Sequence, residues 1–307
     1  MKQFARQIGV DLIGFAPIER FACAPALGGI DPSVYIKPAT GVLVLAGRVQ
    51  SGVRKVAGSY LSDGKTYGPY LWYGYGYLNW FLSECAYRIA SFLESEGYTA
   101  IPFPPTGPTS MYRRYEGFAG LHTDKPFSAD ISHRHAAVAA GLGELGFSGL
   151  LLTPEFGPRQ RLVTIVTDAP LKPDRLYQGP QLCDREHCGI CVSTCPTYAL
   201  NSKNTHKVTI ERKTFEYARV DYTRCLMGVA GFMRKGGART DFNMPPQEDA
   251  ITRDYYRLNR EKRNPIDFTM ISEPVHMNLC GLCLLSCPAP AKTIKNAGAT
   301  HRRMSAR

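Results

Sequence analysis

The N-terminal stretch lacks both a secretion signal and a membrane anchor. Residues 1–21 contain one short apolar run, which is interrupted by Asp11 and followed by Pro17 and Glu19, whereas a signal sequence or a membrane span needs a longer unbroken run. No twin-arginine pair precedes that run. These absences predict a cytoplasmic protein with no membrane partner, and in that reducing compartment the cysteines are expected to stay free of disulfides.

Acidic residues are few compared with basic ones. The 307 residues carry a formal net charge of +11, with 44% hydrophobic and 21% charged residues. This is the composition of a globular protein with room for two domains. The basic surplus can attract nucleic acid or an acidic partner protein, although scattered lysines and arginines are more often ordinary solvated surface.

Cysteine, by contrast, is plentiful after residue 180. One group is spaced C-x4-C-x2-C-x3-C-P and a later group C-x2-C-x3-C-P, with a lone cysteine between them. The members are Cys183, Cys188, Cys191, Cys195, Cys225, Cys280, Cys283 and Cys287. Closely spaced thiolates that end in a Cys-Pro step are typical of loops that wrap a [4Fe-4S] cluster, so the spacing predicts an iron-sulfur protein.

The Cys-Pro steps also predict how the thiolates are shared. In two-cluster ferredoxins, the cysteine before the proline ligates the other cluster. One cluster is then expected on Cys183, Cys188, Cys191 and Cys287, and the other on Cys195, Cys225, Cys280 and Cys283. Loops from two separated stretches of the chain would therefore interlock around a pair of clusters.

Three other interpretations of these cysteines compete with this one. Structural zinc also uses C-x2-C pairs, but two zinc sites would not require a C-x3-C-P ending in both groups. Disulfides need an oxidising compartment. The x4 spacing between Cys183 and Cys188 departs from the bacterial ferredoxin run and also opens the plant-type [2Fe-2S] pattern, which the second group and the Cys-Pro endings disfavour.

Hydrophobic periodicity predicts an α/β arrangement ahead of the cysteines. Short apolar runs bounded by proline and glycine predict strands at residues 12–16, 41–46, 150–153 and 161–167. The first two of these strands are expected to share a sheet. Apolar residues at helical spacing predict helices at residues 78–96 and 131–140. Residues 67–77 are crowded with Tyr, Trp and Gly, which indicates either a pocket for a large planar ligand or, as we favour, a loop covering the core edge.

Several other residues are of types that often serve in functional sites, but their sequence context favours a structural role. Cys85 lies on the apolar stripe of its helix and Cys23 has no neighbouring cysteine, so both are expected to serve packing. His133 and His135 are two apart and should point to different helix faces rather than bind one metal. The glycines of residues 141–149 follow a helix, which is the wrong order for a dinucleotide fingerprint, and suggest that backbone passes close to something bulky.

Two stretches resemble known families. Residues 140–146, A-G-L-G-E-L-G, and 149–159, G-L-L-L-T-P-E-F-G-P-R, are similar to the core of the reductive dehalogenases and, more distantly, to epoxyqueuosine reductase. Residues 11–17, D-L-I-G-F-A-P, look like the dehalogenase pattern as well. Both families continue, as this chain does, into cysteine motifs that end in C-x3-C-P. The resemblance covers most of the chain, and the cysteine motifs are its most specific part.

The resemblance implies a fold and a function. The expected fold class is α/β (α+β), with a nitroreductase-like corrinoid-binding domain at residues 1–175 and a ferredoxin-like double [4Fe-4S] domain at residues 176–307. Electrons from a low-potential donor such as ferredoxin or flavodoxin would pass through the clusters to a cobalamin, for reductive cleavage of a small organic substrate. The glycine-rich stretch would contact the corrinoid through Gly141, Leu142, Gly143, Gly146 and Gly149.

The resemblance also suggests proton donors. An aspartate serves in epoxyqueuosine reductases, and Asp124 or Asp130 stands in that neighbourhood; dehalogenases use a tyrosine with a basic partner, for which Tyr112 or Tyr115 is a candidate. A tyrosine can donate a proton when a nearby cation stabilises its phenolate. Two competing functions remain: an electron-transfer protein without corrinoid, and an epoxyqueuosine reductase-like enzyme that modifies tRNA.

Overall fold

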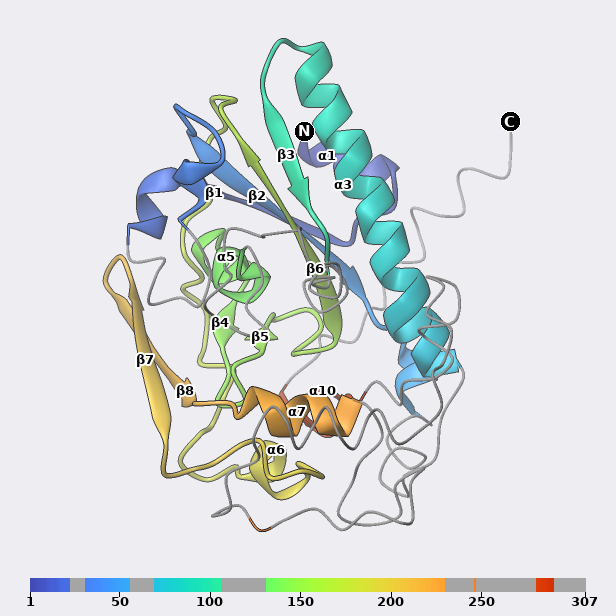
Figure 1. Cartoon of the computed structure of the whole chain (residues 1–307), viewed down its shortest axis with the longest axis vertical. Helices are drawn as coiled ribbons and strands as arrows, with labels where there is room; N and C mark the ends of the chain where they lie inside the picture. Colours follow the sequence, from blue (N-terminus) through green and yellow to red (C-terminus); the bar gives the residue numbers. More distant parts are fainter. Residues whose placement is uncertain (23–30, 56–68, 106–130, 230–245, 247–279, 290–307) are drawn as a thin grey trace, which may run out of the picture.

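The computed structural model describes residues 1–22, 31–55, 69–105, 131–229, 246 and 280–289. Its centre is a four-stranded antiparallel sheet in the order β1-β2-β6-β3 (Figure 1). The strands are β1 (Leu12–Pro17), β2 (Gly41–Arg48), β6 (Gln160–Thr167) and β3 (Ala100–Phe103). The strands expected at residues 12–16, 41–46 and 161–167 and the shared sheet of the first two are thus confirmed, whereas the strand expected at residues 150–153 is limited to Leu151–Leu152 and lies in a separate hairpin. In the register, Leu43 of β2 stands opposite Phe15 of β1 and Ile165 of β6.

Helices cover both faces of this sheet, which explains why β2 is an unbroken apolar run. Helix α3 (Tyr77–Ser95) packs Leu82 and Ile89 against Leu43 and Leu45 on one face. Helix α5 (His133–Ala139) lies against Val44 and its neighbours on the other face. Because successive side chains of a strand point to opposite faces, a strand between two helical layers must be apolar at every position. Helix α1 (Lys2–Gln7) packs beside α3.

The aromatic segment ahead of α3 is helical, not a loop. Residues Tyr70–Gly76 form a π-helix, η4, that runs directly into α3. The favoured loop prediction for residues 67–77 is therefore wrong over this part. The error has a physical cause, since three glycines at positions 68, 74 and 76 lower helix propensity, while Tyr70 and Leu71 gain a buried environment that offsets it.

The cysteine-bearing part is built from short elements beside the sheet. Two hairpins, β4 (Glu144–Leu145) with β5 (Leu151–Leu152) and β7 (Thr205–Ile210) with β8 (Lys213–Ala218), flank single helical turns. The helical elements of this part are α6 (Ile190–Ser193), α7 (Tyr222–Val229) and α10 (Leu282–Leu285), whereas the short 3-10 helices η1 (Ile18–Phe21) and η3 (Pro32–Val34) lie between β1 and β2. Val208, Ile210 and Phe215 of the second hairpin join the same apolar cluster as α5. The domain division at residue 175 stays a prediction.

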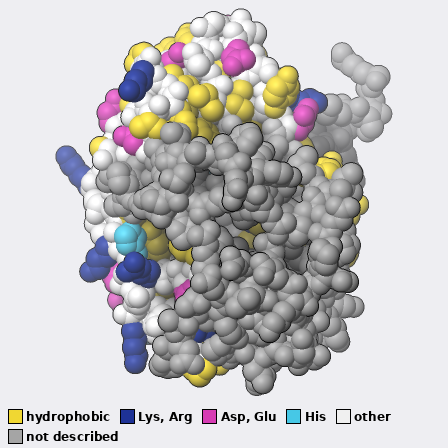
Figure 2. All heavy atoms as spheres, viewed as in Figure 1, with side chains coloured by type: hydrophobic (Ala, Val, Ile, Leu, Met, Phe, Trp, Pro, Cys, Tyr) yellow, Lys and Arg dark blue, Asp and Glu magenta, His cyan; other side chains and the backbone are white. Residues whose placement is uncertain are grey.

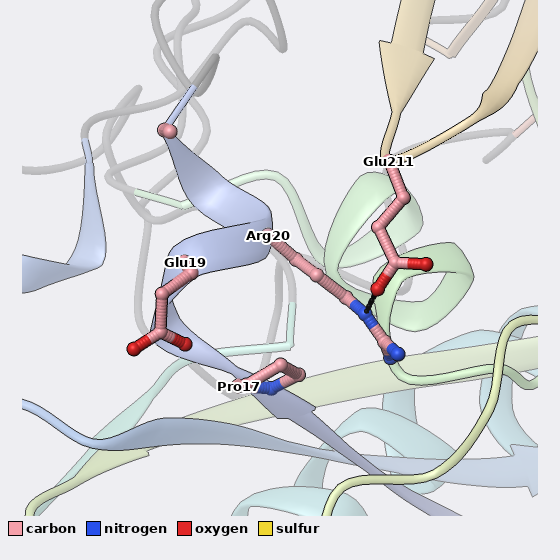
Figure 3. Close-up of a pocket in the computed structure, with 5 residues that line it drawn as sticks. Pro17, Glu19, Arg20 and Glu211 are labelled. Atoms are coloured by element: carbon pink, nitrogen blue, oxygen red, sulfur yellow. Dashed lines mark hydrogen bonds and ion pairs between the residues drawn. The ribbon is translucent and has the colours of Figure 1, made fainter.

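Arg20 ties η1 to this second part of the molecule (Figure 3). Its side chain, only 10% exposed, points from η1 to Glu211, at the turn between β7 and β8, and forms an ion pair there. The same guanidinium donates hydrogen bonds to the carbonyl oxygens of Ala139, at 2.6 Å, and Asp174, at 2.7 Å. One arginine thus joins four segments that are distant in sequence. None of the described helices has the length and apolarity needed to cross a bilayer.

Candidate metal centre

Two matched helical turns carry the central cysteines of the two motifs. Cys191 lies in α6 and Cys283 in α10, and each turn begins after a Cys-Gly step, Gly189 in one case and Gly281 in the other. The two turns contact each other. The sequence repeat C-G-x-C-x3-C-P therefore folds as a spatial pair, which brings together loops that are separated by about ninety residues.

The first set of thiols comprises Cys183, Cys188, Cys191 and Cys287. Burial and then the charges of Cys183, Cys287 and Cys188 raise the pKa of the Cys191 thiol to about 11. Burial first, and then Cys287 and Cys188 among its neighbours, also raises the pKa of Cys183. Cys287, from the far end of the chain, thus lies within electrostatic reach of the first motif. These are the same four residues that the Cys-Pro rule assigns to one cluster.

The second set comprises Cys195, Cys225, Cys280 and Cys283. Burial raises the pKa of Cys280 to about 12, and the charges of Cys225 and Cys195 act in the same direction. The pKa of Cys283 is raised by burial and then by Cys280, Cys225 and Cys195, with a further contribution from Cys191. That last contribution links the two sets. Cys195 thus acts electrostatically on the cysteines of the later motif, which is what the crossed arrangement predicts.

Backbone amides point at several of these sulfur atoms. The N–H of Phe147 donates to Cys183 Sγ at 3.3 Å, and the N–H of Ala199 donates to Cys195 Sγ at 3.2 Å. Amides of Leu282 and Ala289 act in the same way on Cys280 and Cys287 and lower the pKa of each thiol. Such N–H···S bonds stabilise thiolates and raise the reduction potential of a cluster bound to them. The donor set therefore fits a thiolate-bound cluster.

Three charged side chains hold the cysteine loops, and sequence reasoning assigned none of them a role. Glu144 accepts hydrogen bonds from the N–H groups of Leu182, at 2.6 Å, and Cys183, at 3.1 Å. Arg159, buried at 4% exposure, donates to the carbonyls of Cys287 and Ala289 at 2.9 and 2.8 Å.

The third is Arg224, which is also buried. It donates to the carbonyl of Thr197, next to the first Cys-Pro step, at 3.2 Å. Glu144 and Arg159 stand inside the two family-like stretches, which is a signal that could have revealed them, whereas Arg224 carries none.

The glycine-rich stretch is explained by its protein neighbours. A methyl group at Gly141, which has φ +77°, would meet the carbonyl oxygen of Arg175, and one at Gly143 would meet the carbonyl of Leu152. Gly146 faces the Leu152 side chain, and Gly149, at φ +73°, faces the ring of Tyr217. Leu142 packs against the apolar cluster of α5. The expected close approach is therefore made by the chain itself, while corrinoid contact by these residues stays a prediction.

Other expected site residues are placed as follows. Tyr112, Tyr115, Asp124 and Asp130 lie outside the described residues, as does Cys23. Cys85 is 1% exposed, in agreement with a packing role. His133 and His135 do face apart: His133 contacts Thr164 and the Pro104 carbonyl, whereas His135 contacts Ser132 and Tyr217.

Two of the hollows among the described residues adjoin segments named above. One, of about 360 Å³, is lined by Pro17, Glu19, Arg20, Ala22 and Glu211 (Figure 3). The other, of about 400 Å³, adjoins the first set of thiols, with Glu144, Phe147, Cys183, Arg185 and Lys213 in its lining. Both volumes suit a small ligand. Within the described parts of the chain, no three His, Cys, Asp or Glu side chains are arranged to bind a single metal ion.

The fold and the thiols together define a class of protein: an α/β unit joined to cysteine loops that can carry redox clusters. Relatives of known activity fall into two families of reductases. The tetrachloroethene reductive dehalogenase of Dehalobacter restrictus is 34% identical over 144 residues, 46% of this chain and 21% of that protein. The epoxyqueuosine reductase of Cyclobacterium marinum is 38% identical over 80 residues, 25% of this chain and 24% of that protein. The resemblance to both families is thus confirmed. No family model matches the chain.

Solved structures of both families share the fold. A catabolic reductive dehalogenase superposes with a TM-score of 0.52 at 18% identity, over 92% of this chain and 34% of the other. Epoxyqueuosine reductase from Bacillus subtilis gives a TM-score of 0.50 at 20% identity, over 94% of this chain and 63% of the other. The mixed helix and sheet class is therefore confirmed. The chain spans about a fifth of the dehalogenase relatives and a quarter or less of the epoxyqueuosine reductases that it matches in sequence.

Proposed function

We propose that this protein is an iron-sulfur reductase that carries two [4Fe-4S] clusters. The observation that carries the proposal is the convergence of the eight cysteines into two electrostatically linked sets, each of which takes one member from the other motif. Thiolates divided in this way are the ligands of a two-cluster ferredoxin. The amides that donate to the sulfur atoms and the contact between α6 and α10 suit electron transfer between the clusters.

The reductase would use cobalamin to cleave a carbon-halogen, carbon-oxygen or related bond in an organic substrate. Support for the corrinoid comes from the relatives, since one structural neighbour is a reductive dehalogenase for which a mechanism of B12-dependent dehalogenation is suggested. The described residues do not by themselves outline a corrinoid site, because protein atoms fill the space beside Gly141, Gly143 and Gly146. When bound, a corrinoid supplies a strongly reducing cobalt centre, and the protein must exclude water and provide a proton. Tyr112, Asp124 and Asp130 are the proposed proton donors.

The electron source would be a low-potential carrier in the cytoplasm, such as ferredoxin or flavodoxin. A basic protein attracts acidic partners, and this chain remains basic after its clusters are filled. Four thiolates around a core of charge +2 contribute about −2, so two clusters remove about four of the positive charges. A positive surplus out of the original +11 therefore remains for docking.

Anaerobic purification and iron-sulfur reconstitution test the proposal. We expect about eight irons per chain and electron paramagnetic resonance signals of two reduced clusters. The same sample, incubated with hydroxocobalamin and freed of excess ligand, should retain about one corrinoid per chain. Zinc in place of iron would overturn the cluster assignment. Full iron content without retained corrinoid would leave an electron carrier and exclude the corrinoid reductase.

The second candidate function is modification of tRNA. It is favoured by the epoxyqueuosine reductase relatives and by the Lys and Arg side chains that project along the left edge of Figure 2, on the side of β7. This function predicts tRNA binding whose affinity falls steeply as salt rises, because phosphate contacts release counterions. Absence of binding at low salt would rule it out.

A further inference from the structure

Tyr70 lies beside the second set of thiols, although it comes from the opposite end of the sequence. It is the first residue of η4 and is 2% exposed. Its ring packs with Val49, Leu78 and Leu282, and Cys280 lines the same cluster. The charges of Cys280 and Cys283 both act on the phenol group, which places it within electrostatic reach of two cysteines of that set.

Two glycines make room for this tyrosine. A methyl group at Gly74 would stand 2.7 Å from the Tyr70 ring, and a methyl group at Gly281 would overlap the Tyr70 hydroxyl. Gly281 is the residue between Cys280 and α10. The hydroxyl therefore lies against the backbone of the second cysteine motif at Gly281, between Cys280 and Cys283.

The Tyr70 hydroxyl has no hydrogen-bond partner among the described residues, although it is fully enclosed. A buried phenol is normally paired, because leaving its O–H unpaired costs free energy. A tyrosine phenol is protonated at physiological pH and can therefore act as a donor. The hydroxyl adjoins the backbone of Gly281, and Cys280 of the second set packs against the same apolar cluster as the Tyr70 ring.

We infer that Tyr70 donates its O–H to a sulfur atom of the second cluster and thereby raises the reduction potential of that cluster. The inference rests on the proposed cluster-binding function. A reduced cluster carries one more negative charge than an oxidised one, so a donor to its sulfur atoms stabilises the reduced form. Tyr70 also excludes water from this side. The π-helix η4 positions Tyr70, which binds no metal itself but acts on the cluster through its hydroxyl.

Replacing Tyr70 with phenylalanine tests this directly, because the change removes one oxygen and keeps the ring. In the reconstituted protein, the potential of one cluster should fall while that of the other is unchanged. A hydrogen bond of ordinary strength corresponds to about a fivefold to tenfold change in the ratio of reduced to oxidised cluster, and tenfold is about 59 mV for one electron. The measurement is a redox titration followed by electron paramagnetic resonance.

Tyr73→Phe is the matched control. Tyr73 stands in the same π-helix but is 51% exposed, so loss of its hydroxyl should change neither potential. Gly281→Ala should lower the same potential as Tyr70→Phe, because the added methyl displaces the hydroxyl. Unchanged potentials in Tyr70→Phe, at full iron content, would overturn the inference.

Iron content separates this inference from the proposed function. Wild-type protein without iron refutes the function, whereas wild-type protein with two clusters and an unaffected Tyr70→Phe variant refutes only the role of Tyr70. If Tyr70→Phe does not fold, 3-fluorotyrosine introduced at position 70 replaces it. Fluorine makes the O–H a stronger donor, so the potential of the second cluster should rise. No change would count against the hydrogen bond.

Discussion

The sheet and the cysteine-bearing part of this molecule are stabilised in different ways. The sheet is enclosed between two large apolar clusters, one under α3 and one under α5. Around the cysteines, the apolar clusters are small, and charged side chains such as Glu144 and Arg159 hold loop backbone instead. A region with little apolar core depends on a bound metal for its stability. The comparison suggests that the sheet folds on its own side chains, whereas the cysteine loops need their clusters.

Substitution of a cysteine in each part gives the largest expected contrast. Cys283→Ala removes a proposed ligand of the second cluster, so iron should fall from about eight to about four per chain. Cys85→Ala, in the buried stripe of α3, should leave the iron content unchanged and cost only packing energy, about 1 kcal/mol. Iron analysis of anaerobic samples, together with thermal unfolding, checks both. Equal iron loss in the two variants would contradict the division into structural and ligand cysteines.

Glycine replacements sharpen the comparison at the junction of the two parts. Gly143→Ala would force a methyl group into the Leu152 carbonyl, so the β4–β5 hairpin should be displaced, with a loss of at least about 3 kcal/mol. Gly97→Ala has open space around it but a φ of +87°, which costs about 1 kcal/mol for a residue with a side chain. Urea unfolding of both variants measures the difference. A larger cost at Gly97 would show that the hairpin can move aside.

Arg20 tests whether the two parts support each other. Arg20→Met removes the ion pair to Glu211 and leaves the carbonyls of Ala139 and Asp174 without their donor. We expect the free energy of unfolding to fall by about 2 kcal/mol, since bonds from a charged donor are lost in a mostly buried place. The control is Arg88→Met, because Arg88 pairs with Glu84 on the exposed face of α3 and such helix pairs contribute about 0.5 kcal/mol or less. Similar effects of the two changes would argue against a link through Arg20.

The sequence was most informative where one physical rule acted alone. The strands at residues 12–16 and 41–46 and the helix at 78–96 follow from apolar periodicity, and the structure contains them with ends shifted by one or two residues. A rule about Cys-Pro steps predicts the division of the thiols, and their assignment to two clusters stays a prediction. The π-helix at Tyr70 did not follow from local propensity, because Gly74 is explained only by the side chains of Tyr70 and Val49 that lie against it.

The supports of the cysteine loops could not be predicted for a related reason. Arg159 and Arg224 donate to carbonyl groups of residues that are far away in the sequence, and any carbonyl can accept such a bond. An arginine in the sequence therefore does not reveal its partner. The glycines in residues 141–149 indicated a close approach, but which segment approaches depends on the tertiary fold.

The smallest expected effect concerns His135, a residue of α5 that contacts Tyr217 of β8. Its ring nitrogens contact the hydroxyls of Ser132 and Tyr217 at 2.6 and 2.9 Å. Burial first, and then the charges of Arg134 and His206, lower the pKa of His135 from 6.5 to about 3. In the unfolded chain the ring is protonated below its ordinary pKa, while in the folded protein it stays neutral. Stability from this group is therefore complete above pH 6.5 and is lost as the pH falls toward 3.

Comparison of wild type with His135→Gln isolates this dependence, because acid effects on the cysteine region are common to both. At neutral pH the variant should be less stable by about 1 kcal/mol, the value of a lost hydrogen bond. Below pH 6.5 the advantage of wild type should shrink by roughly 1.4 kcal/mol per pH unit, so the two stability curves cross near pH 6 by about that slope. Urea unfolding at a series of pH values measures this crossing. Parallel curves would mean that His135 takes up its proton at the same pH in the folded and unfolded protein. Its pKa would then not be lowered by burial, and the ring would not stay neutral in its contact with Tyr217.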